Sequence, residues 1–212
     1  MRNAAICVPN SVERRESFCY PGRMPALRTV SRPLLLVTAL VAAAACDRMR
    51  PAEVPHPLNG AARYLCCNLY YEKTTVSDVG YQVGTKIPFG TRVHIEHVRK
   101  DRVEFTPEGH PTITVEYKYG EKTVPFETYL TELLVESDPH RALRKVPAKR
   151  VATIEQGLVE QGMTKAQVKM ARGIPPFHRT PSLDSPTWTY WNTRWDTMAV
   201  YFAGDKVERV QH

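Results

Sequence analysis

The sequence contains no apolar run long enough to cross a membrane as a helix. Its longest apolar stretch, Leu34–Ala45, has twelve residues, whereas a spanning helix needs about 20. Motifs of several enzyme classes are also missing: Gly-x-Ser-x-Gly, His-Glu-x-x-His, a phosphate-binding P-loop and the paired cysteines of a zinc site. The sequence therefore gives no positive sign of an enzyme, a metal site or a cofactor.

Cysteine is scarce, and beyond Cys46 only Cys66 and Cys67 remain. They are adjacent, which is not the spacing of metal ligands. On a strand, neighbouring side chains point to opposite faces, so we expect one thiol to be buried and the other to lie exposed or at an edge. Buried, reduced cysteines are the default state, and a disulfide between the two neighbours is the alternative.

The excess of positive charge comes mainly from the first part of the chain. The formal charge is +7, but six of the 29 basic residues and two of the 22 acidic ones precede Cys46. The remaining 23 basic and 20 acidic residues give only +3, so a nucleic-acid partner loses its main support. "HRALRKVPAKR", residues 140–150, is a local basic cluster that either contacts anionic lipid head groups or, as its composition favours, forms a solvated linker.

The apolar stretch before Cys46 has the composition of a secretory signal. Arg28 and Arg32 supply positive charge ahead of it, and alanines end it. Ala-Ala-Ala-Cys46 resembles the lipobox of bacterial lipoproteins, which implies acylation of Cys46 and cleavage before it. Residues 1–45 are then a signal region, with Met24 as the expected start. An ordinary cleavable signal with a nearby cysteine is the alternative.

The rest of the chain divides into a tether and two folded parts. Residues 46–61 contain three prolines and little apolar content, which is typical of a semi-extended tether. Residues 62–138 alternate as short strands do. "YLCCNLYY" predicts one strand, and "RVHIEHV" predicts another with His94 and His97 on opposite faces, so that they cannot share a metal ion without a bulge. Phe126–Leu134 has the 3.6-residue period of a helix that covers one side of a sheet.

Residues 139–212 predict two helices followed by three strands. Thr164 and Gln167 form a capping box for a helix over 165–172, with Met163 and Val168 as a hydrophobic staple and Gly173 as the stop. A weaker helix is expected over 151–159. "TWTYWN", "TMAVYFAG" and "VERV" predict a meander whose core side chains include Trp188, Tyr190, Met198, Val200 and Phe202.

Two resemblances refine this α+β fold class. "GMTKAQVKMARGIPP", "WTYW" and "MAVYFAGDKVERV" resemble the SmpA/OmlA (BamE-like) family of outer-membrane assembly-factor lipoproteins, which implies an ααβββ domain over 139–212. "IPFGTRV" looks like the start of bacterial SH3-like domains, which implies a small barrel or curled antiparallel sheet, with its helix, over 62–138. The family's compact assembly subunit has no counterpart of this β-rich part.

Four residues are candidates for partner binding. Trp191 lies on the opposite strand face from the core residues, and Arg194 with Trp195 lies near a turn; exposed Trp beside Arg is typical of binding hot spots. Partial burial of these aromatics under residues 62–138 is the alternative. Asp184 lies in a Pro-bounded loop, where it either caps a turn or contacts a partner.

Together these features predict a lipid-anchored, periplasm-facing protein that binds an envelope partner and does not catalyse a reaction. The resemblance implies the outer membrane and the β-barrel assembly machinery, while Asp47 after Cys46 resembles an inner-membrane retention signal of enteric bacteria. A cell-wall-binding or peptide-binding SH3-like lipoprotein is the alternative.

We expect intact-mass analysis of membrane-extracted protein to find a chain that begins at Cys46 and carries acyl groups. Cys46→Ala removes the thiol that is acylated, so this variant should leave the membrane fraction. A soluble product without acyl groups that begins upstream of Cys46 would contradict the prediction.

Overall fold

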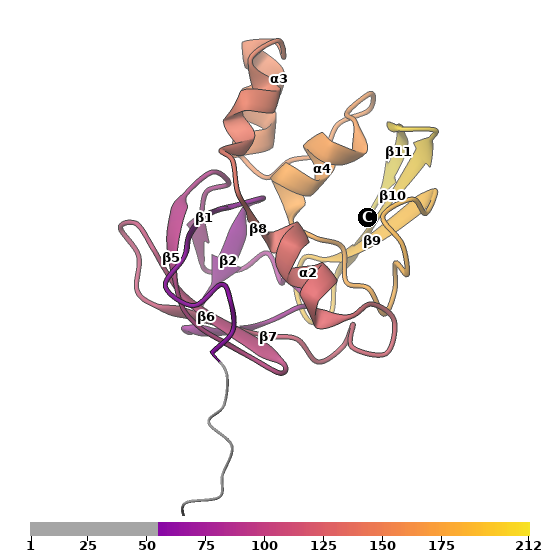
Figure 1. Ribbon diagram of the computed structural model, residues 1–212. Helices are drawn as coiled ribbons and strands as arrows, with labels where there is room; N and C mark the ends of the chain where they lie inside the picture. The colour runs from indigo at the N-terminus through magenta and orange to yellow at the C-terminus, as the bar shows by residue number, and fades with distance from the viewer. Residues whose placement is uncertain (1–54) are drawn as a thin grey trace, which may run out of the picture. The chain divides into compact units, whose positions relative to one another are not determined.

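Residues 55–212 are described by a computed structural model, and their largest sheet is curled (Figure 1). Six strands lie in the order β3-β7-β6-β5-β1-β8. The bounds are Ala62–Leu65 (β1), Thr75–Ser77 (β3), Arg92–Arg99 (β5), Arg102–Pro107 (β6), Ile113–Glu116 (β7) and Leu134–Val135 (β8). All pairs are antiparallel except β3–β7, which is parallel and was not expected. The predicted signal, Cys46 and most of the tether lie outside the described residues.

A short helix closes one side of the curled sheet, as its sequence period predicts. Helix α2 spans Phe126–Leu133 and buries Tyr129, Leu130 and Leu133. These side chains pack with sheet residues such as Ile95 and Phe105, which are fully buried. The first hydrophobic core therefore lies between α2 and the concave side of the sheet.

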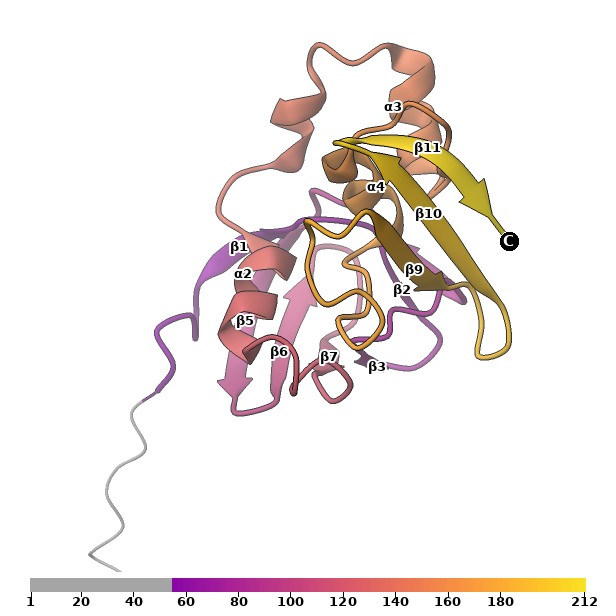
Figure 2. The ribbon, with the colours of Figure 1, turned by 90° about the vertical axis from the view of Figure 1, so that its right-hand side faces the viewer.

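The second half places helices before a three-stranded meander, which confirms the α+β class. The elements are η2 (Pro139–Leu143), α3 (Ala148–Glu155), α4 (Lys165–Arg172), β9 (Thr187–Trp191), β10 (Thr197–Ala203) and β11 (Lys206–Gln211). Figure 2 shows the meander packed along α4. The five predicted core side chains of the meander are all buried, including the two largest, Trp188 and Tyr190, at 2% and 1% exposure.

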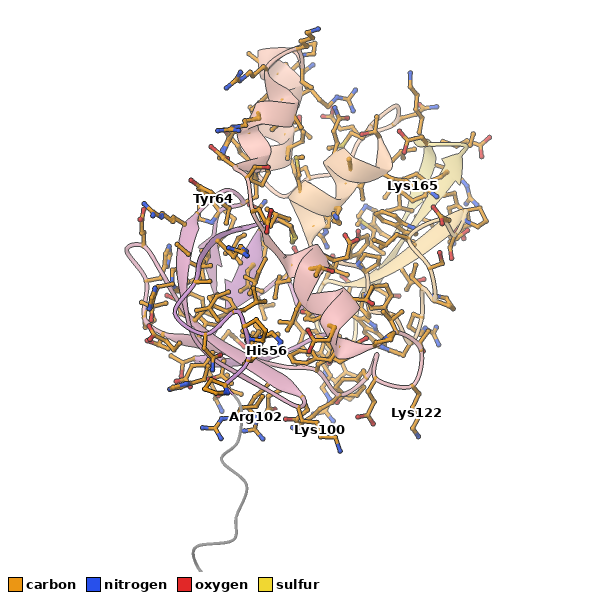
Figure 3. All side chains as sticks on the ribbon, viewed as in Figure 1. His56, Tyr64, Lys100, Arg102, Lys122 and Lys165 are labelled. Carbon is orange, nitrogen blue, oxygen red and sulfur yellow. A yellow bond between two sulfur atoms is a disulfide. The ribbon has the colours of Figure 1, made fainter. Side chains whose placement is uncertain are left out.

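Helix α4 begins and ends where the capping signals place it. The Thr164 hydroxyl accepts a hydrogen bond from the Gln167 backbone, and the Gln167 side chain accepts one from the Thr164 backbone. Met163 and Val168 are fully buried in the second core. Gly173 stops the helix with a φ of 91°, a value that suits glycine. Lys165, labelled in Figure 3, lies over the rings of Trp188 and Phe202.

The prediction of one strand over "YLCCNLYY" is wrong, because the chain bends at Cys66 and continues as β2 (Leu69–Tyr71). The Cys66 N–H donates to the Leu133 carbonyl, and the Asn68 N–H donates to the Met170 carbonyl. Because these N–H groups donate to helical residues, they take no part in the hydrogen bonding of the sheet.

The two cysteines at this bend are joined as a disulfide, which is the alternative and not the default reduced state. Both are buried, at 3% and 1% exposure. The expectation that one of them would be exposed is therefore also wrong.

Two elements, β5 and α3, differ from their predictions for local reasons. Strand β5 contains a bulge between Ile95 and His97, so Val98 turns inward with Ile95, and His94 and His97 both lie exposed. Helix α3 lies about three residues earlier than predicted. Pro147 precedes its first turn and Gly157, with a φ of 78°, follows its end.

Asn68 joins the two halves through a buried side chain. Its amide nitrogen donates to the carbonyls of Ile154 (3.1 Å) and Ala171 (3.0 Å), and its oxygen accepts from the Phe89 N–H (3.0 Å). The two cores also interlock, because Phe89 packs in the second core and Ile174 in the first. Residues 55–212 lie within one compact unit, and a domain boundary after residue 138 stays a prediction.

Candidate binding surface

A pocket lined by tyrosines lies between β2 and β3. Its volume is about 230 Å³. Tyr70, Tyr71 and Tyr81 line it and are half-buried, while Glu72 and Lys73 lie exposed at its rim. Leucine and valine side chains form the rest of its apolar lining. Such a mixture of aromatic wall and polar rim is typical of a site for a small ligand or a side chain of a partner.

The pocket exists because two consecutive strands do not pair with each other. β2 pairs with β4 (Thr85–Ile87) in a separate two-stranded sheet, whereas β3 is the edge of the six-stranded sheet. Thr74 and Asp78 bond to β7 through their backbone. Because backbone groups alternate in direction along a strand, the N–H and C=O of Thr75 point away from β7. The free edge of β3 therefore carries unused backbone groups beside the tyrosines.

Asp78 fixes the chain where it leaves β3. This buried carboxylate accepts hydrogen bonds from the backbone N–H groups of Lys118, Tyr119 and Gly120, the shortest at 2.8 Å. Burial raises the pKa of the neighbouring Tyr117 hydroxyl to about 12, and the Asp78 carboxylate adds to the effect. The loop that carries Tyr81 therefore starts from a rigid point.

Arg172, the last residue of α4, links this helix to the β9–β10 hairpin and to the turn after α3. Its guanidinium donates to the Asn192 side chain and, at 3.3 Å, to the Gly157 carbonyl. Burial lowers the pKa of Arg172, against the opposing influence of Tyr190, Tyr70 and Asp196. Any side chain at residue 157 would collide with Tyr70, because a Cβ there would lie 2.6 Å from its hydroxyl oxygen.

Gln82 connects the pocket loop to the β9–β10 hairpin. Its side-chain amide donates to the carbonyls of Arg172 and Gly80, both at 2.9 Å. Its backbone N–H donates to the Asn192 carbonyl at 3.1 Å. The tyrosine pocket and the hairpin tip, far apart in sequence, therefore adjoin each other.

The hairpin tip presents the most exposed large apolar side chain of residues 55–212. Trp195 is 87% exposed, and the Arg194 guanidinium lies 5.2 Å from the centre of its ring. The turn is closed, because the Asn192 N–H and side chain both bond to Asp196, at 2.9 and 2.7 Å. An ordered turn thus holds an unburied Trp–Arg pair in solvent.

Three of the four predicted site residues come together, and one does not. Trp191, half-buried at the end of β9, is next to the turn that carries Arg194 and Trp195. Asp184 precedes β9 and is therefore separated from the tip by the length of that strand. Its backbone N–H donates to the Ser182 hydroxyl and its carbonyl accepts from Lys165.

The pocket residues were not predicted from the sequence. The tyrosines stand in segments that read as a strand and a turn, and no spacing indicates that β2 and β3 would both be edges. The only signal in the sequence at Arg172 is that an arginine stands where the SmpA/OmlA family usually has a leucine, directly before the capping glycine.

Other kinds of site find no support among the described residues. No group of three or more His, Cys, Asp or Glu side chains within residues 55–212 could hold a metal ion. None of the helices in this part of the chain is both long and apolar enough to span a bilayer. Comparison of the chain with models of protein families, with curated proteins and with solved structures finds no match.

We expect Arg172→Lys to loosen the hairpin tip. A lysine cannot reproduce the two directed contacts with Asn192 and Gly157, and a hydrogen bond to a charged group contributes about 1.5–3 kcal/mol. Hydrogen exchange of residues 192–196 should accelerate at least roughly tenfold. Arg179→Lys is the control, because Arg179 is exposed and lies in the connection between α4 and β9. It should leave the hydrogen exchange of residues 192–196 unaltered. Equal protection in both variants would contradict the assigned role.

Proposed function

We propose that this protein is a lipid-anchored component of the cell envelope that faces the periplasm and acts by binding a partner protein. The observation that carries the proposal is the exposed pair of Arg194 and Trp195 on a closed turn. Trp and Arg are enriched among interface residues whose truncation costs at least about 2 kcal/mol. The pair needs no chemistry beyond contact, so the proposed role includes neither catalysis nor a cofactor.

The adjoining tyrosine pocket enlarges this surface. Gln82 holds the pocket loop against the hairpin, so a partner that covers Trp195 can also place a side chain among Tyr70, Tyr71 and Tyr81. Aromatic anchors surrounded by polar groups are typical of the central part of an interface.

The identity of the partner is proposed from the resemblance. The order α3, α4 and then β9–β11 agrees with the ααβββ arrangement of the SmpA/OmlA family, and fold agreement alone does not establish function. We propose a subunit of the β-barrel assembly machinery as the partner and the outer membrane as the location. Asp47 is the feature that argues for the inner membrane instead.

The second candidate function is recognition of a peptide or of cell wall by an SH3-like part of the chain. The specific observation in its favour is the pocket between the unpaired edges of β2 and β3. An extended peptide could bond to the free backbone groups of Thr75 and place an apolar side chain among the tyrosines.

We expect Trp195→Ala and Arg194→Ala to lower co-purification of the barrel-assembly subunit from detergent-solubilised membranes at least tenfold. Leu158→Ala is the matched control, because Leu158 is also an exposed apolar residue, at 53%. Recovery with this control should equal the wild type. A wild-type chain that recovers no such subunit would refute this partner, and unchanged recovery with Trp195→Ala would refute the surface.

Sedimentation with purified cell wall separates the second candidate from the first. That candidate predicts cell-wall binding that Tyr81→Ala reduces severalfold, since the substitution opens one wall of the pocket. Tyr119→Ala, at a tyrosine 54% exposed and outside the pocket lining, is its control. Sedimentation that neither substitution changes would exclude the pocket as the site.

A further inference from the structure

The exposed positive charge of η2 and the start of α3 forms a cluster that the proposed function does not use. Residues 139–151 contain five Arg or Lys and no Asp or Glu. Four of these side chains are exposed and define the basic cap: Arg141, Arg144, Lys145 and Lys149. Figure 3 shows nitrogen-tipped side chains projecting outward around α3.

The composition of residues 140–150 favours a solvated linker, and the structure corrects this prediction. The basic cap belongs to a folded segment that packs against the rest of the unit. Leu143 is buried in the second core. The His140 ring lies 4.5 Å from the Phe89 ring and bonds to Asp138, which also accepts from the His140 N–H. Pro147 leads directly into α3. Because the backbone is held in this way, the four charged side chains project from fixed backbone positions.

No carboxylate of residues 55–212 neutralises the cap by direct contact. None of its four side chains takes part in an ion pair. Of the nearby acids, Asp138 bonds to His140 and lies near enough to Arg141 for that cation to help lower its pKa, and Glu160 is paired with Arg150 at 3.9 Å. Lys86 adds a further cation at the other end of α3, where its ammonium donates to the Glu155 carbonyl.

The cap lies at the end of the unit opposite to the first described residues. In Figures 1 and 2 the indigo start of the chain and α3 are at opposite poles. A folded unit of this size has a radius of gyration of about 15 Å, or a diameter of about 39 Å as a sphere. The nine residues from 46 to 54 reach at most about 32 Å. A chain anchored through Cys46, as the proposed function requires, therefore cannot turn over fully to lay its cap flat on that membrane.

We propose that the basic cap binds an acidic protein surface on the side of the molecule that faces away from the anchoring membrane. Two of its four cations are arginines, which bind carboxylates in a bidentate manner. The reach of the tether disfavours lipid head groups. Single-stranded nucleic acid is disfavoured because residues 139–151 contain no Phe, Tyr or Trp on which bases could stack, and the His140 ring packs against Phe89.

The test uses the full lipidated chain in vesicles of neutral phosphatidylcholine and fluorescent poly-L-glutamate as the acidic probe. One variant replaces the four cap residues by glutamine. The matched control replaces four exposed cations elsewhere by glutamine: Lys100, Lys122, Arg179 and Lys206. The two variants lose equal charge, and circular dichroism verifies that both remain folded.

We expect the cap variant to bind the probe at least tenfold more weakly and with a smaller dependence on salt, and the control to change less than threefold. Equal losses in both variants would overturn the proposal, because binding would then follow net charge alone. The proposal would also fail if the wild-type chain bound phosphatidylglycerol vesicles more tightly than poly-L-glutamate in a cap-dependent manner. Absence of acylation at Cys46 would instead refute the anchor, and intact mass reports that separately.

Discussion

The way in which the two halves of residues 55–212 pack together depends on the buried side-chain amide of Asn68. The side chain is only 2% exposed, so each of its polar atoms must find a partner within the protein. Two carbonyls, those of Ile154 and Ala171, can only accept, and the Phe89 N–H can only donate; the orientation of the amide is therefore determined. One side chain thus joins the β1–β2 bend, the ends of two helices and the turn before β5.

The candidate binding surface follows from this constraint. With the ends of α3 and α4 held at Asn68, Gly157 lies against Tyr70 and Arg172 lies beneath the hairpin. Gln82 then closes the gap between pocket loop and hairpin. Neither half of the chain could form this surface alone, since the tyrosines come from the first half and the Trp–Arg pair from the second.

The sequence predicts those parts of the fold that local chemistry determines. Helix α4 has its staple, its capping box and its stop within the eleven residues Met163–Gly173, and the meander has clear alternation; both appear as predicted. The bend at Cys66–Asn68 and the bulge in β5 depend on partners more than 60 residues away or on strand register, which the local pattern does not contain. The same holds for the pocket, because only the pairing of β3 with β7 leaves β2 and β3 apart.

Unfolding of Asn68→Ala in urea tests the central claim most directly. All three tryptophans, Trp188, Trp191 and Trp195, report on the second half, while hydrogen exchange of β5 and β6 reports on the first. Each buried group left without a partner costs about 1–3 kcal/mol. We predict that both probes shift together to lower urea, by a total of at least about 3 kcal/mol. A change below about 1 kcal/mol, or a shift of the tryptophan signal while β5 and β6 keep their protection, would contradict the account.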